Sequence, residues 1–199
     1  MMRETGTPLL EARQEIEDTI AIIDSMVAFA DKNDDGSEVL DPVGVVGAIT
    51  PSQLPLQCGA IFSVAAILGG NAIVHKPSKY TPGIGQTIAE LWDRSNLERG
   101  VYNMVQGPGS IIGRQLVSEK GLNGLIVASS YATGTAIKNC ASAGTRLFLH
   151  MGGKSNAIVS SDCDLDLTTS EIIASFCRAS GQRADAIARI VVVKDVLHS

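Results

Sequence analysis

The sequence lacks several features that would assign it to a specialised class of protein. Its 16 basic residues form no cluster and its formal net charge is −5, so we expect no nucleic-acid partner. Its four cysteines form no C-x-x-C pair, which excludes a zinc site or a disulfide framework signalled by spacing. These are Cys58, Cys140, Cys163 and Cys177.

Long apolar segments are also missing. The longest, residues 61–68, is too short to cross a bilayer, and charged Arg3 and Glu4 stand where a secretory signal would begin its apolar region. We therefore expect no membrane contact, no metal, reduced thiols and a cytoplasmic location. With 45% hydrophobic and 19% charged residues, the chain has the balance of a globular protein that can bury a core.

The pattern of apolar residues divides the chain into segments. Apolar residues recur at helical spacing from Pro8 to about Asp31, which predicts an amphipathic helix that ends in the run 32–36. Short β-branched runs then alternate with helical stretches, as in a parallel sheet built from βαβ units. The predicted strands are 43–49, 71–75, 101–105, 125–128 and 146–149, and the helices are 56–68, 83–93, 110–119 and 133–143.

This pattern predicts an α/β fold with a small doubly wound parallel sheet. A tail of strand 157–160, helix 167–179 and strand 190–193 is assigned to a second lobe. Ligands of doubly wound sheets bind beyond the carboxyl ends of the strands, so the loops 49–55 and 75–82, with those at 107–113 and 128–134, are candidate sites.

Two features of these loops suggest a nucleotide. Lys76 follows a strand and precedes a proline turn, where its ammonium could meet a ribose or phosphate, although on its own an ordinary surface lysine is the favoured interpretation. Gly107, Gly109 and Gly113 open a helix whose free N–H groups can face a phosphate. They do not form the G-x-G-x-x-G fingerprint, and a simple turn is the alternative.

Taken together, the loops resemble the aldehyde dehydrogenase superfamily in order and spacing from Arg3 to about Val193. The matching stretches are R-E-T-G at 3–6, P-V-G-V-V at 42–46, K-P-S at 76–78 with T-P at 81–82, G-V-Y-N-M-V at 100–105, G-G-K-S at 152–155 with A-I-V at 157–159, D-L-D at 164–166, Phe176, G-Q at 181–182 and R-I at 189–190.

The resemblance implies a helical segment at 1–40, an NAD(P)-binding Rossmann-like domain at 41–151 and the start of a catalytic lobe at 152–199. It also implies that less than half of a typical member is present, without the segment that precedes R-E-T-G or the long C-terminal portion. The positions that it assigns to cofactor binding are Thr50, Ser52, Lys76, Ser78, Lys79, Gly107, Gly109, Ser130, Gly134 and Met151.

The same resemblance places the family's catalytic residues at altered positions. The nucleophilic cysteine of its G-Q-x-C stretch is Ala184 here, and a methyl group cannot attack an aldehyde. Cys177 lies seven residues earlier, roughly 10 Å away along a helix, and is expected to be a buried structural residue. The general base is replaced by His150, which is either a base or a structural histidine, and the oxyanion-stabilising asparagine by Gln53.

Two cofactor positions also depart from the family. The acidic residue that often follows the lysine by three places is Lys79, which disfavours NAD and favours the 2′-phosphate of NADP. In the T-G-S-x-x-x-G stretch, Ser129 replaces the first glycine, and its side chain can crowd a pyrophosphate.

Three functional readings follow. The first is a non-catalytic homologue with residual NADP or NAD binding that serves as an assembly partner or regulatory subunit. The second is a working NAD(P)-dependent aldehyde oxidoreductase that takes its nucleophile from another chain or uses another mechanism, and the third is a degenerate fragment without function. The apolar residues of 157–199 and the strand edge at 190–193 predict a second copy or another protein as partner.

Overall fold

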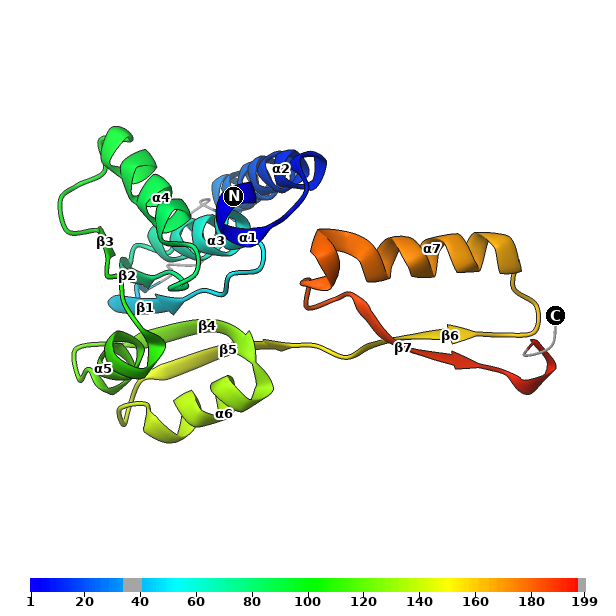
Figure 1. Ribbon diagram of the computed structural model, residues 1–199. Coiled ribbons are helices and arrows are strands. Elements are labelled where there is room, and N and C mark those ends of the chain that lie inside the picture. The colour runs from blue at the N-terminus through cyan, green and yellow to red at the C-terminus, as the bar shows by residue number, and fades with distance from the viewer. Residues whose placement is uncertain (34–40, 197–199) are drawn as a thin grey trace.

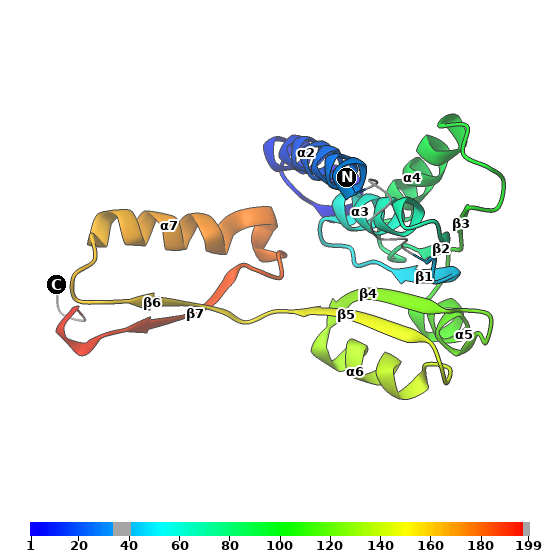
Figure 2. The ribbon, with the colours of Figure 1, turned by 180° about the vertical axis from the view of Figure 1, so that it is seen from behind.

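A computed structural model describes residues 1–33 and 41–196. Its elements form two parts, a five-stranded sheet covered by helices on both faces and a two-stranded sheet covered by one helix (Figure 1). The chain passes from the first part to the second as a nearly straight segment, which is clearest from behind (Figure 2).

The larger sheet is entirely parallel and has the strand order β3-β2-β1-β4-β5. Its order reverses between β1 and β4, which confirms the predicted doubly wound sheet. The strands are β1 Val45–Ile49, β2 Ala72–Lys76, β3 Tyr102–Met104, β4 Gly124–Ser130 and β5 Arg146–Gly152. β4 and β5 run past the predicted ends because their pairing continues to Ser130 and Gly152.

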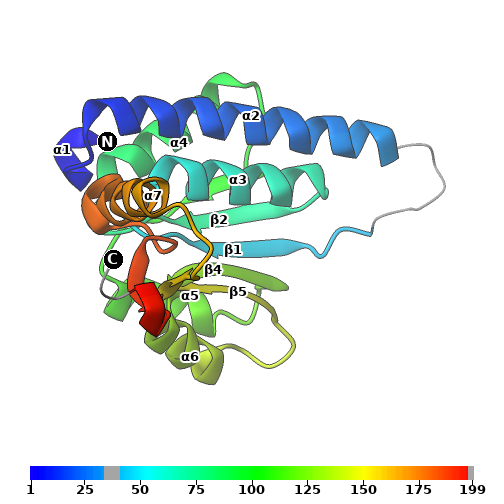
Figure 3. The ribbon, with the colours of Figure 1, turned by 90° about the vertical axis from the view of Figure 1, so that its right-hand side faces the viewer.

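Helices cover both faces of this sheet (Figure 3). α3 Pro55–Leu68 and α4 Pro82–Arg94 lie on one face. A π-helical turn η1 Gly109–Gly113, which continues as α5 Arg114–Ser118, and α6 Tyr131–Cys140 lie on the other. α6 begins two residues before its predicted start because the Ser130 hydroxyl caps it, accepting a hydrogen bond from the Thr133 amide at 3.4 Å.

The core lies in two layers, one on each face of the sheet. Alternate residues of the central strands point to opposite layers, so these strands are apolar on both sides, as a covered parallel sheet requires. The α5 side contains Leu116, Val117, Leu122, Leu125 and Val127, and the α3 side contains Val46, Ala48, Ala66 and Ile73.

A long N-terminal helix packs on the outside of α3 (Figure 3). A short helix α1 Met2–Thr5 precedes it, and α2 spans Leu9–Asn33. The predicted helix is confirmed, whereas 34–36 of the run expected to end it lie outside the described residues. Its apolar residues Ile16, Ile20 and Val27 are exposed, and Ala12, Glu15 and Thr19 are buried. Ile23, Met26 and Ala30 continue the face of Ala12, Glu15 and Thr19 and are partly buried, so only part of the predicted apolar stripe lies on the buried face.

The second part contains the parallel pair β6 Ser155–Val159 and β7 Ile187–Val192. Helix α7 Leu165–Cys177 and the short helix η2 Arg178–Gly181 connect them, and η3 Lys194–Val196 follows. Both strands begin earlier than predicted because the pairing starts at Ser155 and Ile187. Several large apolar side chains here are exposed, namely Ile158, Ile173, Phe176, Ile190 and Val191.

Neither a membrane-spanning helix nor a group of metal ligands is found in the described part of the chain. None of its helices combines the length and the apolar character needed to cross a bilayer. Within residues 1–33 and 41–196, no three His, Cys, Asp or Glu side chains are grouped so that they could hold a metal ion.

Candidate functional site

The point where the strand order reverses defines the carboxyl edge at which a ligand would sit. Thr50 directly follows β1, Lys76 ends β2 and Ser130 ends β4. The Thr50 amide donates to the Lys76 carbonyl at 3.2 Å, so the first two strand ends are joined by their backbones. The structure thus brings together candidate residues from three loops that the sequence separates.

Lys76 is the most unusual residue at this edge. Its side chain is only 3% exposed, and its Nζ donates a hydrogen bond to the Pro77 carbonyl at 3.0 Å. In the part of the chain that the structure describes, no carboxylate pairs with it. Burial lowers the pKa of Lys76 from its ordinary value. An ammonium that lacks a carboxylate partner is suited to the hydroxyl or phosphate oxygens of a ligand.

The neighbouring residues Ser78 and Lys79 lie on the turn that leads to α4. Ser78 accepts a hydrogen bond from the Tyr80 amide at 3.3 Å, which shapes the turn. Lys79 is exposed, and its Nζ lies 4.8 Å from the centre of the Tyr80 ring. Its charge is therefore available to an anion near Lys76.

Carboxylates from the N-terminal segment already occupy two helix N-termini near this edge. Glu4 accepts hydrogen bonds from the Gly83 and Ile84 amides of α4 at 2.8 and 3.1 Å. Glu15 does the same for Leu56 and Gln57 of α3 at 2.9 and 3.2 Å. Free N–H groups at a helix start attract anions. Because the two carboxylates already accept hydrogen bonds from these groups, neither helix start is open to an anionic ligand.

The start of η1 is less crowded. A Cβ atom at Gly109 would meet no atom within 4 Å, so a ligand can approach the backbone there, whereas one at Gly107 would lie 2.4 Å from Ile112. Gly107 also has φ +152°, which a side chain would strain. Gly113 packs against Lys76, since its Cβ would lie 3.5 Å from Lys76 Cε. These glycines therefore have distinct structural roles.

The loop between β4 and α6 holds the remaining cofactor candidates. Gly134 is buried under Met151, and a Cβ at Gly134 would lie 2.5 Å from the Met151 sulfur. This close approach means that packing against Met151 is a sufficient reason for a glycine at position 134. The Ser129 hydroxyl bonds to the Ser130 carbonyl at 3.1 Å.

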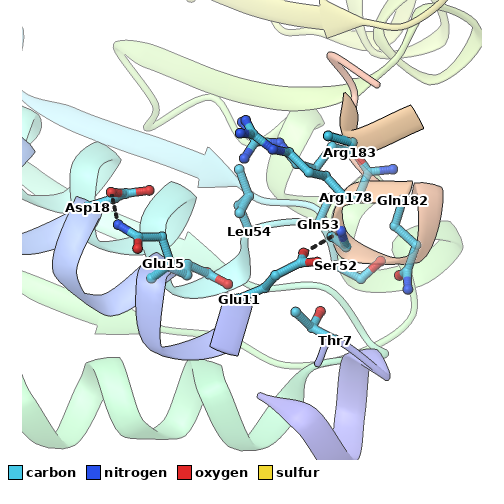
Figure 4. Close-up of a pocket in the computed structure, with 13 residues that line it drawn as sticks. Thr7, Glu11, Glu15, Asp18, Ser52, Gln53, Leu54, Arg178, Gln182 and Arg183 are labelled. Carbon is cyan, nitrogen blue, oxygen red and sulfur yellow. Dashed lines mark hydrogen bonds between the residues drawn. The ribbon is translucent and has the colours of Figure 1, made fainter. Parts of the chain in front are cut away.

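The altered catalytic positions come together only in part. Gln53 and Ser52 line a pocket of about 460 Å³ between α2 and the η2 region, together with Gln182, Arg183 and Arg178 (Figure 4). Ala184 follows this group and lies against the end of β5, because a Cβ at Gly152 would be 2.7 Å from the Ala184 Cβ.

His150 does not line this pocket. It is exposed near the end of β5, and its ring centre lies 5.5 Å from that of Phe62. The Ala184 position therefore lies two residues along the strand from His150, beside Gly152, while Gln53 faces the pocket from the first loop.

One ion pair and two hydrogen bonds hold the loop that carries Ala184. Arg183 donates two hydrogen bonds to Asp185, both at 2.7 Å, which raises the pKa of Arg183 and lowers that of Asp185. Gln182 donates to the Thr5 carbonyl at 2.9 Å, and Glu11 accepts from the Ala179 amide. The N-terminal segment thus holds the loop through two hydrogen bonds.

Cys177 was predicted to be a buried structural cysteine, and this prediction is wrong. The residue is exposed at the end of α7. Ala179 and Ser180 follow with φ of +49° and +57°, so the chain leaves the helix axis there. Cys177 is not among the residues that line the pocket.

Sequence reasoning missed His75. Its ring is fully buried, with Nε2 2.9 Å from the Thr50 hydroxyl and Nδ1 2.8 Å from the Tyr102 hydroxyl. Burial, with a smaller contribution from the Lys76 charge, lowers the pKa of His75 to about 4. The polar residue in the otherwise apolar run A-I-V-H was the available signal.

Gln106 was also missed. Its side-chain nitrogen is buried and has no hydrogen-bond partner within the described residues. It lies at the first turn of α4, since a Cβ at Gly85 would be 3.3 Å from this nitrogen and 2.3 Å from Pro77 Cγ. A donor without a partner beside Pro77 is a further polar group near the Lys76 turn.

The chain belongs to the aldehyde dehydrogenase family, whose model matches residues 1–199. It is 32% identical to the α-ketoglutaric semialdehyde dehydrogenase of Bacillus subtilis over 96% of this chain and 41% of that protein. It is also 32% identical to the D-glyceraldehyde dehydrogenase (NADP+) of Thermoplasma acidophilum, over 98% of this chain and 42% of that one.

Solved structures agree with the fold. The NADP-dependent glyceraldehyde-3-phosphate dehydrogenase of Bacillus halodurans, complexed with NADP, superposes with a TM-score of 0.90 at 32% identity, covering 98% of this chain and 44% of that one. The chain spans about two-fifths of the length of the curated relatives that it matches.

The buried histidine leads to a prediction about pH. Because the folded-state pKa of His75 is about 4 and the unfolded value is 6.5, the unfolded state binds more protons as pH falls below 6.5. The stability that neutral His75 contributes is complete above pH 6.5 and is lost as pH falls towards 4. Between pH 8 and 5 the loss amounts to about 2 kcal/mol.

Urea unfolding of the wild type and of His75→Gln at pH 8 and pH 5 measures how much His75 contributes to the change of the free energy of unfolding with pH. The wild type should lose about 2 kcal/mol more than the variant. His150→Gln, a change at an exposed histidine, is the control and should lose as much unfolding free energy between the two pH values as the wild type does. An equal loss in the wild type and in His75→Gln would refute the prediction.

Proposed function

We propose that this chain is a nucleotide-binding member of its family that does not itself carry out the covalent step of aldehyde oxidation. The observation that carries the proposal is Ala184, which stands at the nucleophile position of the G-Q-x-C stretch. Its Cβ packs beside Gly152, so the backbone brings this position to the end of β5, but with a methyl group.

Nucleotide binding is supported by the chemistry of the carboxyl edge. Lys76 is buried and has no carboxylate partner among the described residues, and the backbone near Gly109 is open to a phosphate. The Ser129 hydroxyl is directed to its own backbone neighbour. Relatives carry NADP or NAD+, as in the Bacillus halodurans enzyme with NADP and the Staphylococcus aureus betaine aldehyde dehydrogenase with NAD+. The residues present therefore fit NADP or NAD.

The covalent step requires a thiolate that attacks the aldehyde carbon, so that hydride can leave for the nicotinamide. Ala184 offers no such group, and Cys177 lies outside the pocket. His150 has no acyl-enzyme to hydrolyse without that thiolate. The alternative function, NAD(P)-dependent oxidation of an aldehyde to a carboxylic acid, would need a nucleophile from another chain.

The exposed apolar face of the second part supports a role in assembly with a second copy of this chain. β6 and β7 form a sheet of only two strands, whose outer edges offer unpaired N–H and C=O groups. Ile158, Ile190 and Phe176 are exposed beside these edges. Pairing with the same strands of a second copy would cover both features.

The first test of this function is turnover. The purified chain, given a panel of short aldehydes and either nucleotide, should produce no NAD(P)H above the rate of a blank, because Ala184 cannot form the covalent intermediate. Absorbance at the reduced-nicotinamide band measures this rate. Turnover that disappears in Cys177→Ser but persists in the exposed control Cys140→Ser would contradict the proposal.

The second test is cofactor preference. Lys79 adds a positive charge near Lys76, so NADP should bind about tenfold more tightly than NAD, the size expected for one charge-assisted hydrogen bond. Lys79→Glu should reverse the preference towards NAD in titration calorimetry. Lys120→Glu, an exposed lysine before β4 at the opposite edge, is the charge-matched control. Equal wild-type affinities, or tighter NAD binding, would disprove it.

The third test is assembly. Light scattering at micromolar concentration should give a mass above the monomer, and Ile190→Lys should lower it because a charge enters the apolar face. Lys194→Ala, which changes an exposed neighbour without adding charge to that face, is the control. A stable wild-type monomer in which residues 157–192 are fully protected from hydrogen exchange would rule out this interface.

A further inference from the structure

His75 connects three adjacent strands at the carboxyl edge of the sheet. The residue belongs to β2, and its two ring nitrogens contact the hydroxyls of Thr50, after β1, and of Tyr102, in β3, at 2.9 and 2.8 Å. Neutral imidazole has one donor and one acceptor nitrogen, so both contacts can be hydrogen bonds in either tautomer. The ring thus links the side chains of β1, β2 and β3.

The surroundings fix the orientation of this ring. A Cβ atom at Gly59 of α3 would lie 2.9 Å from His75 Cε1, so the helix backbone approaches the ring as closely as glycine allows. Tyr102 is held in turn by stacking on Trp92, with ring centres 6.0 Å apart. The Trp92 indole donates to the Ser63 hydroxyl at 3.1 Å, which ties this group to α3.

The residue held at the other end of the network is Thr50. It begins the loop 50–54, which carries Ser52 and Gln53 to the start of α3. Its amide donates to the Lys76 carbonyl at 3.2 Å, and its hydroxyl meets His75 at 2.9 Å. Backbone and side chain therefore both tie the loop to β2, directly beside Lys76.

Core stability alone does not require a histidine at this position. Replacing a buried hydrogen-bonded pair by apolar groups of the same shape can be nearly neutral, and the neighbours Ile73 and Ile88 show that the layer accepts apolar side chains. A polar ring supplies what an apolar one cannot, which is a direction for the Thr50 hydroxyl. Burial also keeps the ring neutral, so it can accept and donate at once.

We propose that His75 is a positioning residue for nucleotide binding, which holds Thr50 and the loop 50–54 in a fixed place relative to Lys76. The inference rests on the proposed nucleotide binding and adds to it a residue that does not touch the ligand. His75 acts through Thr50, from the opposite side of the sheet to the one where Lys76 meets Gly113.

The test compares variants that keep different hydrogen bonds. His75→Gln can place an amide near the Nε2 position and keep the bond to Thr50, whereas His75→Asn can reach only the Nδ1 position and keep the bond to Tyr102. His75→Phe and Thr50→Val remove the Thr50 contact with little change of volume. Val117→Ala, in the core layer on the other face, is the control for general destabilisation.

Calorimetry should show that His75→Phe, His75→Asn and Thr50→Val each weaken NADP binding about tenfold, while His75→Gln stays near the wild type. The double variant Thr50→Val with His75→Phe should be no weaker than either single variant, because both remove one interaction. Val117→Ala should lower the melting temperature without changing the affinity. In the nucleotide-free chain, hydrogen exchange at residues 50–57 should rise in His75→Phe but not in Val117→Ala.

Two results would overturn the inference. If the wild type binds NADP and His75→Phe binds it equally well, with exchange at residues 50–57 unchanged, positioning fails while the proposed function stands. If the affinity follows the melting temperature across all variants, with His75→Gln no better than His75→Asn, the role is structural only. A wild type that binds neither nucleotide overturns the proposed function itself, and the inference with it.

Discussion

The five-stranded parallel sheet must cover both of its faces, and the rest of the structure depends on this constraint. Apolar residues of β1, β2 and β4 contribute to both core layers, and the charged residue of these three strands, Lys76, stands at a strand end. The reversal of order between β1 and β4 gathers Thr50, Lys76 and Ser130 at one edge. His75 is a fully buried polar residue in one of these layers, and both of its ring nitrogens are paired.

The N-terminal segment determines which parts of that edge stay open. Glu4 and Glu15 neutralise the starts of α4 and α3, and neither carboxylate pairs with Lys76. The segment also reaches the second part, where Glu11 accepts from Ala179 and Thr5 accepts from Gln182. One helical segment thus shields the helix ends from anions, leaves the ammonium free for a ligand, and anchors the loop that carries Ala184.

Sequence pattern predicted the architecture well because strand and helix periods are local properties. Every predicted strand from 43 to 149 overlaps an observed one, and the doubly wound order follows from alternating elements. The side chains were harder to predict because their environment depends on distant segments. Cys177 is exposed at the end of its helix, and Glu15 of α2 is buried where it accepts from the first amides of α3, a helix without a side-chain cap at its N-cap residue.

The candidate site shows the same contrast between what local pattern predicts and what depends on distant segments. Motif order identified Lys76, Gln53 and Ala184, and the structure brings Gln53 and the 181–184 loop to one pocket. No local pattern could reveal that Thr50, His75 and Tyr102 meet, because they belong to three separate segments, the end of β1, β2 and β3, which only the sheet register aligns. The cofactor roles of all the positions assigned by the resemblance, Lys76 and Met151 included, stay predictions.

Binding and chemistry are separable in this fold because they come from different parts of the chain. The groups suited to a nucleotide lie on strand ends of the larger sheet, fixed by its register and by the layer that holds His75. The nucleophile position lies beyond β6 and α7, on a loop held by Gln182, Arg183 and Asp185. Exchanging a thiol for the methyl of Ala184 removes reactivity at that loop but alters no contact at Lys76 or Thr50. Under the proposed function, losing the covalent step would therefore leave the contacts of the first half unchanged.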